Sequence, residues 1–297
     1  LVGNTVAGNY IQEVGWFSRE QVGFVQVTFI APLIEEPSKA IVLFFIARSR
    51  YFNTMTDGFV YGAAAGLGFG MTENFFYFSN LHDLIMEYPT GGFGAWVDLV
   101  TVRSLGSAML HAVASSCLGA ALAWARFRGR LPSGMAILLG FVIAMGIHAL
   151  WNGLASVSML ETRPARAAAV TEGLHYLLYV VFALEFLMVF CIFQLCLLNE
   201  RKIIREELIR ESEEEGTLPP DHVPALGNNL VRSLQRFAPP GVPQEAYIRA
   251  ATTLAFRRAQ ARIAPKSIRS FYQQDLVRLR GEVRAILSEE VVILDST

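Results

Sequence analysis

The stretch APLIEEPSK at residues 31–39 places two adjacent acids and a lysine inside an apolar run. Ionisable side chains near a bilayer centre are unfavourable by about 2.5–3.5 kcal/mol each, so they rarely occur there without a function. Three further apolar runs contain polar groups of this kind: FGMTEN at 69–74, HAVAS at 111–115 and HALWN at 148–152. Three carboxylates and two imidazoles at similar depth predict one polar site inside a helical bundle. Activation of water is the chemistry most natural to Glu and His together.

The composition indicates a membrane part followed by a charged part. Of the 297 residues, 53% are hydrophobic and 17% are charged, against roughly 25% charged in soluble domains. Residues 1–199 contain 10 Lys/Arg and 12 Asp/Glu, whereas residues 200–297 contain 15 and 14. The net charge of −1 gives no argument for nucleic-acid binding. The three cysteines lie in apolar runs without metal-ligand spacing, which favours reduced packing residues.

Five apolar runs are long enough to span a bilayer, and they predict an all-α, polytopic bundle of at least five spans. The runs lie near residues 21–47, 58–81, 96–125, 134–160 and 174–199. Arginines follow the first, third and fifth runs, so these connections and the C-terminal region are expected in the cytoplasm. The mixed charges of the fourth connection fit this orientation least well. The expected location is the cell membrane.

Residues 200–297 are predicted to form a second, small helical region outside the bilayer. A charged helix at 206–215 is followed by a proline-rich segment between Pro219 and Pro243. Apolar residues at helical spacing then predict helices through about residue 263 and at 266–288. This pattern indicates no activity.

The residues of the four polar stretches could have a purely structural role as well as a functional one. Pro32 and Pro37 kink a helix, and Lys39 can pair with either Glu35 or Glu36, so this stretch could be only a structural ion pair. Because adjacent acids face different directions on a helix, one is expected to serve chemistry and the other to bind Lys39 or backbone.

The acid of the second stretch and the histidines of the third and fourth can also be structural or functional. Glu73 follows glycines 62, 66 and 70, whose spacing allows close helix packing. His111 shares a helix face with Ser115, and His148 shares one with Asn152. A lone histidine is often only an interhelical hydrogen-bond donor, but two of them opposite three acids favour a site. Glu185 is expected to be structural, and Arg103, His175 and Cys191 show no specific signal.

The ordered motifs EExxK (Glu35, Glu36, Lys39), FxxxE (Phe69, Glu73), HxxxS (His111, Ser115) and HxxxN (His148, Asn152) resemble the PrsW family of intramembrane proteases. That family resembles, in turn, the CAAX prenyl endopeptidases and Abi proteins. The resemblance covers about residues 25–160 and does not explain the C-terminal region. CAAX enzymes usually have FxxxH where this chain has FxxxE, which favours PrsW.

The resemblance implies an intramembrane endopeptidase that cleaves a single-pass, membrane-anchored protein such as an anti-sigma factor. Carried over, Glu35 or Glu36 is the general base and Glu73 is its partner. His148 and Asn152 are then the oxyanion donors, and His111 supplies a further imidazole. A prepositioned oxyanion donor typically contributes about 2.7–4 kcal/mol.

Two other functions stay open at this stage. The first is a zinc-dependent version of the protease, with Glu73, His111 and His148 as ligands, because protease zinc sites often use two His and a Glu. The metal-free site is slightly favoured, since the sequence has no HExxH motif. The second is a transporter or inactive scaffold that uses the same cluster as a proton relay or binding site.

Overall fold

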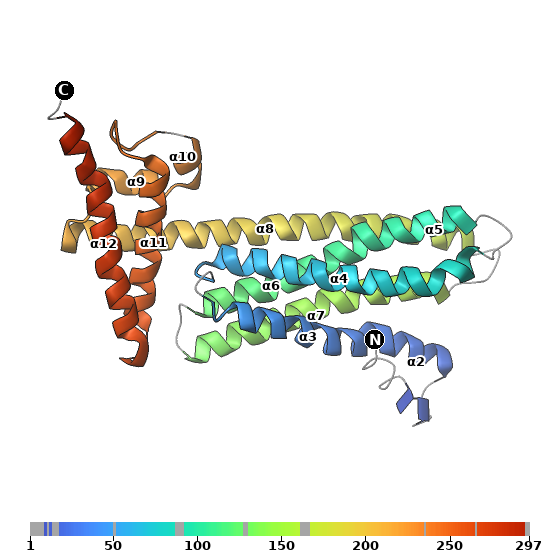
Figure 1. The fold of residues 1–297 in the computed structure, drawn as a ribbon. Helices are drawn as coiled ribbons and strands as arrows, with labels where there is room; N and C mark the ends of the chain where they lie inside the picture. The colour runs from blue at the N-terminus through green and yellow to red at the C-terminus, as the bar shows by residue number, and fades with distance from the viewer. Residues whose placement is uncertain are drawn as a thin grey trace. The chain divides into compact units, whose positions relative to one another are not determined.

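The computed structural model describes residues 9–10, 12–13, 18–49, 52–86, 92–126, 130–160, 167–234, 236–264 and 266–294. Throughout these residues the regular structure is helical and no strand occurs (Figure 1). The all-α prediction is therefore confirmed. Much of the second and fourth predicted connections, including Glu87 and Glu161, lies outside the described residues.

The chain divides into two compact units. The first unit consists of residues 1–52, 57–123 and 134–193, and the second of residues 53–56, 124–133 and 194–297. Helix α8 (Ala167–Glu215) belongs to both and continues past residue 199, where the predicted fifth run ends. The change from apolar to charged residues within α8 therefore does not interrupt the helix.

The helices of the first unit coincide with the five predicted runs. They are α2 (Arg19–Val25), η1 (Gln26–Ile30) and α3 (Ala31–Ile46), then α4 (Met55–Met86), α5 (Gly92–Thr101), η2 (Val102–Ser107), α6 (Ala108–Ala125), α7 (Arg130–Leu160) and the first part of α8. Three described segments are long and apolar enough to cross a membrane: Gly92–Ala125, Arg130–Ser156 and Tyr179–Glu215. The other two predicted spans, near residues 21–47 and 58–81, are not among these segments and stay predictions.

Helices α4 and α6 pack backbone against backbone, as the glycine spacing predicts (Figure 1). A Cβ atom at Gly62 would lie 2.3 Å from the Ser115 carbonyl oxygen, and one at Gly66 would lie 2.0 Å from that of His111. At Gly70 the nearest atom is Cδ2 of the His111 ring, at 3.0 Å. The glycines thus bring α6 close enough for His111 to lie beside α4.

Two short π-helical segments, η1 and η2, interrupt the otherwise α-helical ladder of the first unit. π-helical turns are rare and frequently occur at functional sites, because they release backbone groups from the regular ladder. One such group is used here, since Asn152 Nδ2 donates a hydrogen bond to the Val27 carbonyl of η1 at 2.8 Å. The sequence reasoning predicted a proline kink in this region but neither π-helical segment.

The second unit has its own apolar core, built by the end of α8 with α9 (Val223–Leu226), α11 (Gln244–Ile263) and α12 (Lys266–Leu294). The short helices η3 (Pro220–His222) and α10 (Asn229–Leu234) also belong to this unit. Helix α8 ends at Glu215 because Gly216 adopts a φ of 58°, which glycine tolerates best. The two last predicted helices are present, and α12 continues to Leu294 instead of residue 288.

Buried ion pairs accompany this core. Glu211 is fully buried. Its carboxylate accepts hydrogen bonds from Arg258 Nη1 at 2.5 Å and from Arg280 Nε at 2.7 Å. Arg258 also pairs with Glu214. The charged sequence of the tail is thus partly an internal network and not only a solvated surface.

Candidate functional site

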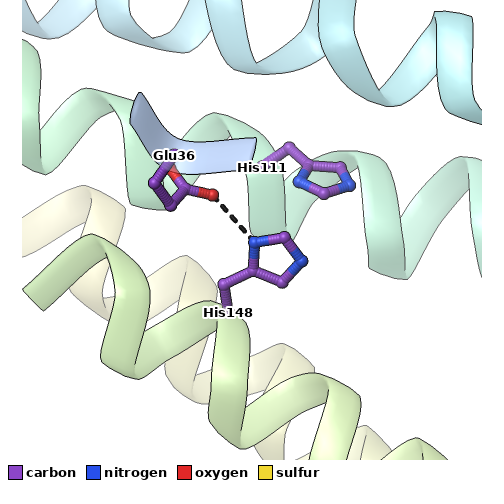
Figure 2. Close-up of side chains that lie close together, drawn as sticks. All are labelled: Glu36, His111 and His148. Carbon is purple, nitrogen blue, oxygen red and sulfur yellow. Dashed lines mark hydrogen bonds and ion pairs between the residues drawn. The ribbon is translucent and has the colours of Figure 1, made fainter. Parts of the chain in front are cut away.

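Four helices of the first unit deliver the acids and imidazoles predicted from sequence to one place. Glu35 and Glu36 lie on α3, Glu73 on α4, His111 on α6 and His148 on α7. All except Glu73 are buried, with Glu36 0% and His111 1% exposed. Figure 2 shows Glu36, His111 and His148 close together, with His148 Nδ1 donating to Glu36 Oε1 at 2.8 Å.

Lys39 connects Glu36 to His111. Its ammonium donates to Glu36 Oε1 at 2.6 Å and to His111 Nδ1 at 2.9 Å. Because an ammonium has donors and no acceptor, His111 Nδ1 must be the accepting nitrogen and the ring proton lies on Nε2. Glu36 is therefore the acid that pairs with Lys39, as one of the two adjacent acids was expected to do.

The outer ring nitrogens face the other two acids. His111 Nε2 donates to Glu73 Oε2 at 2.9 Å, and His148 Nε2 lies 3.8 Å from Glu35 Oε2. Each imidazole thus faces the Glu36–Lys39 pair with Nδ1 and an outer acid with Nε2. Such carboxylate–histidine pairs fix the tautomer and orientation of the ring.

A cavity of about 570 Å³ lies beside the outer acids. Glu35 and Glu73 line it, together with Asn152 and the aromatic rings of Phe69, Phe76, Tyr77 and Trp151. Both π-helical segments also border it, through Val27 of η1 and through Arg103 and Ser107 of η2. Glu36, His111 and His148 are not among its lining residues, so the site has an inner group and a cavity-facing group.

Arg103 is a site residue that the sequence reasoning missed. Its Nη2 lies 2.9 Å from Glu73 Oε2, its Nε donates to Asn74 Oδ1 at 2.9 Å, and its guanidinium lies 3.5 Å from the centre of the Tyr77 ring. Arg103 and His111 therefore contact the same oxygen of Glu73. A lone arginine within an apolar run is the signal that could have found it.

The other sequence candidates lie apart from the chemistry. The backbone of Ser115 packs against Gly62. Its hydroxyl has no hydrogen-bond partner among the described residues. Glu185 of α8 is buried, and neither of its oxygens has a hydrogen-bond partner there. Cys191 is exposed, whereas the side chain of His175 lies outside the described ones.

The inner group matches the donor set of a protease metal site. Glu36, His111 and His148 each offer one ligand atom, and these atoms lie within 4.8 Å of one another. Two His and one Glu are a common ligand set for catalytic zinc. Glu73, which the sequence suggested as a ligand, instead contacts the outer nitrogen of His111 and occupies the position of a supporting acid.

A buried acid–imidazole cluster beside a cavity, built on membrane-type helices, is typical of a membrane-embedded hydrolase. The family model that matches this chain, over residues 1–188, is described as PrsW family intramembrane metalloprotease. The chain therefore belongs to the PrsW family, and it is an intramembrane protease located in the membrane. No curated protein and no solved structure matches the chain.

These findings change one prediction and leave another untested. The preference for a metal-free site is not supported, because the family is described as metalloproteases and the structure groups a fitting donor set. Zinc is thus a plausible cofactor. The wider relation to CAAX and Abi proteins does not follow from the family match and stays a prediction.

Proposed function

We propose that this protein hydrolyses a peptide bond of a single-pass membrane protein, such as an anti-sigma factor, in the cavity lined by Glu35, Glu73 and Asn152. One observation carries the proposal. Glu73, hydrogen-bonded to His111, and Glu35, 3.8 Å from His148, line the same cavity as the Asn152 amide, which can donate a hydrogen bond. The apolar and aromatic lining suits a segment of substrate that leaves the bilayer.

Glu35 is the general base in this proposal. It lines the cavity, where its carboxylate can take a proton from water, and its Oε2 lies 3.8 Å from the outer nitrogen of His148. Glu73 assists from α4, where contacts with His111 and Arg103 fix its orientation. The two acids thus approach the substrate from different helices.

Asn152 stabilises the oxyanion in this proposal. One N–H of its amide donates to the Val27 carbonyl, which leaves the second N–H for the developing charge. His148, the other candidate donor, does not line the cavity in the described structure and contacts both acids of α3 instead. We therefore assign it to positioning.

Glu36, His111 and His148 would hold a zinc ion. When bound, zinc supplies a Lewis acid and lowers the pKa of a bound water to about 7. Glu73 and Glu35, on the outer ring nitrogens, would orient the two imidazoles for that purpose.

The proposed orientation places the C-terminal region in the cytoplasm. Arginines follow the first, third and fifth runs, which favours the cytoplasmic side for these segments. Residues 53–56 and 124–133, from the first and third connections, belong to the same compact unit as residues 194–297. This common membership supports one side for all three.

Cleavage by the purified protein in liposomes tests the function. A panel of single-span substrates is incubated with wild-type protein, with and without a zinc chelator, and the products are sized by mass spectrometry. We expect cleavage near the membrane boundary, loss of cleavage on chelation and recovery with zinc. Proton flux without any cleavage would favour a transporter instead, and cleavage unaffected by chelation would remove the zinc assignment.

A further inference from the structure

The inner group already contains a cation of its own. Lys39 is 3% exposed, and its Nζ lies 2.6 Å from Glu36 Oε1 and 2.9 Å from His111 Nδ1. Glu36 and His111 are two of the three residues that could hold a metal ion. The ammonium therefore uses lone pairs that a metal ion would also need.

The ammonium and a divalent cation exclude one another from these donors. The single lone pair of His111 Nδ1 can accept from Lys39 or bind a metal ion, but not both. Two like charges at this separation also repel strongly in a buried site. The Phe69 ring, whose centre lies 4.4 Å from Nζ, further stabilises the ammonium in its place.

We propose that Lys39 is an internal competitor for the metal, which occupies the donors of Glu36 and His111 in the metal-free protein and is displaced when zinc binds. Zinc affinity is then set by the cost of moving this ammonium as well as by the ligands. The proposal rests on the assignment of the inner group as a zinc site. It does not depend on which substrate is cleaved.

A second consequence concerns the metal-free protein. Glu36 is fully buried, and a buried carboxylate without a partner strongly destabilises a fold. Lys39 supplies the charge that Glu36 needs before metal arrives, so the helices can assemble around the empty donors. Removal of the ammonium should make folding depend on zinc.

Zinc affinity of the full chain in detergent tests the proposal, measured by competition with a chromophoric chelator. Lys39→Met removes the charge and keeps the length, and we expect zinc binding tighter by about tenfold to a thousandfold, because a like charge within about 4 Å is lost. Lys39→Arg keeps the charge and should bind no tighter than wild type. Lys202→Met, at a lysine that is 71% exposed on α8, is the matched control and should leave zinc affinity unchanged.

Folding of the variant gives a second readout. If Lys39→Met purifies only with zinc present, and the double variant with His148→Ala does not purify at all, the competition is supported. Zinc binding in Lys39→Met equal to or weaker than in wild type would overturn the proposal, as would equally poor folding with and without zinc. If wild-type protein cleaves no substrate but Lys39→Met binds zinc more tightly, the proposed protease function is rejected and the role of Lys39 stands.

Discussion

At the scale of single residues, Glu35 and Glu36 have different surroundings despite being neighbours. Glu35 faces the cavity, whereas Glu36 is enclosed by Lys39 and His148. A turn of about 100° per residue on the helix explains this difference. The two positions should therefore respond differently to the same substitution.

Glu35→Gln should abolish cleavage without unfolding the protein, because the amide keeps the shape of the side chain and loses its basicity. Glu36→Gln should instead reduce stability, by about 3–5 kcal/mol, since it leaves the buried Lys39 without its counter-charge. Thermal unfolding in detergent and cleavage of the same preparations distinguish the two effects. Glu185→Gln, at a buried carboxylate elsewhere on α8, is the control and should be mild. Full activity of the Glu35 variant would refute the base assignment.

Asn152→Ala should lower kcat by about 10²–10³-fold, the typical loss for one oxyanion donor. Substrate binding should change little, because the donor acts mainly on the charge that develops during reaction. The separate measurement of kcat and KM on one substrate checks this split. A rise in KM alone would assign Asn152 to substrate binding or to support of the Val27 carbonyl.

The identity of the polar residues could be read from sequence, but their pairing could not. Charged groups in apolar runs are rare enough to single out Glu35, Glu36, Glu73, His111 and His148. Which acid faces which ring nitrogen depends on how far each helix is rotated, and this information is not present in the motif. Arg103 was missed for a related reason, since its role depends on Glu73 of another helix.

At the scale of the elements, the contact between α4 and α6 positions His111. The glycine spacing predicted this contact, because small residues every four positions leave a flat surface for a neighbouring backbone. The two π-helical segments could not be predicted in the same way. They arise where packing and hydrogen bonding in the bundle override the local preference for the α-helix.

Gly66→Ala should destabilise the first unit and reduce activity, since its methyl group would lie 2.0 Å from the His111 carbonyl oxygen. The two helices must then separate, which we expect to cost about 1–3 kcal/mol. Gly68→Ala lies one half-turn away on the same helix with nothing within 4 Å, and it should be neutral or slightly stabilising. Unfolding temperatures and cleavage rates of the pair measure the difference. Equal behaviour of the two variants would argue against close packing of α4 on α6.

At the scale of the whole molecule, the sequence indicates two regions with different solvents, and the structure contains two compact units. The boundary is the part that sequence could not define. Hydropathy changes near residue 199, but α8 continues to Glu215, because helical backbone hydrogen bonds do not depend on whether the side chains are apolar or charged. The core of the second unit includes Ile204 and Leu208 of that helix, so part of α8 is also part of the tail fold.

The orientation of the chain in the bilayer gives the last prediction. Single cysteines are introduced at Thr90, Arg128 and Glu215 after replacement of the three native cysteines, and a membrane-impermeant thiol reagent is applied to cells and to inverted vesicles. Position 90 should react from outside, because the second predicted connection contains no Lys or Arg before Arg103. Positions 128 and 215 should react only from inside, because arginines follow the third and fifth runs and both positions belong to the same compact unit. Labelling of positions 90 and 128 from the same side would mean an even number of spans between them, and the single span predicted through Gly92–Ala125 would then be wrong.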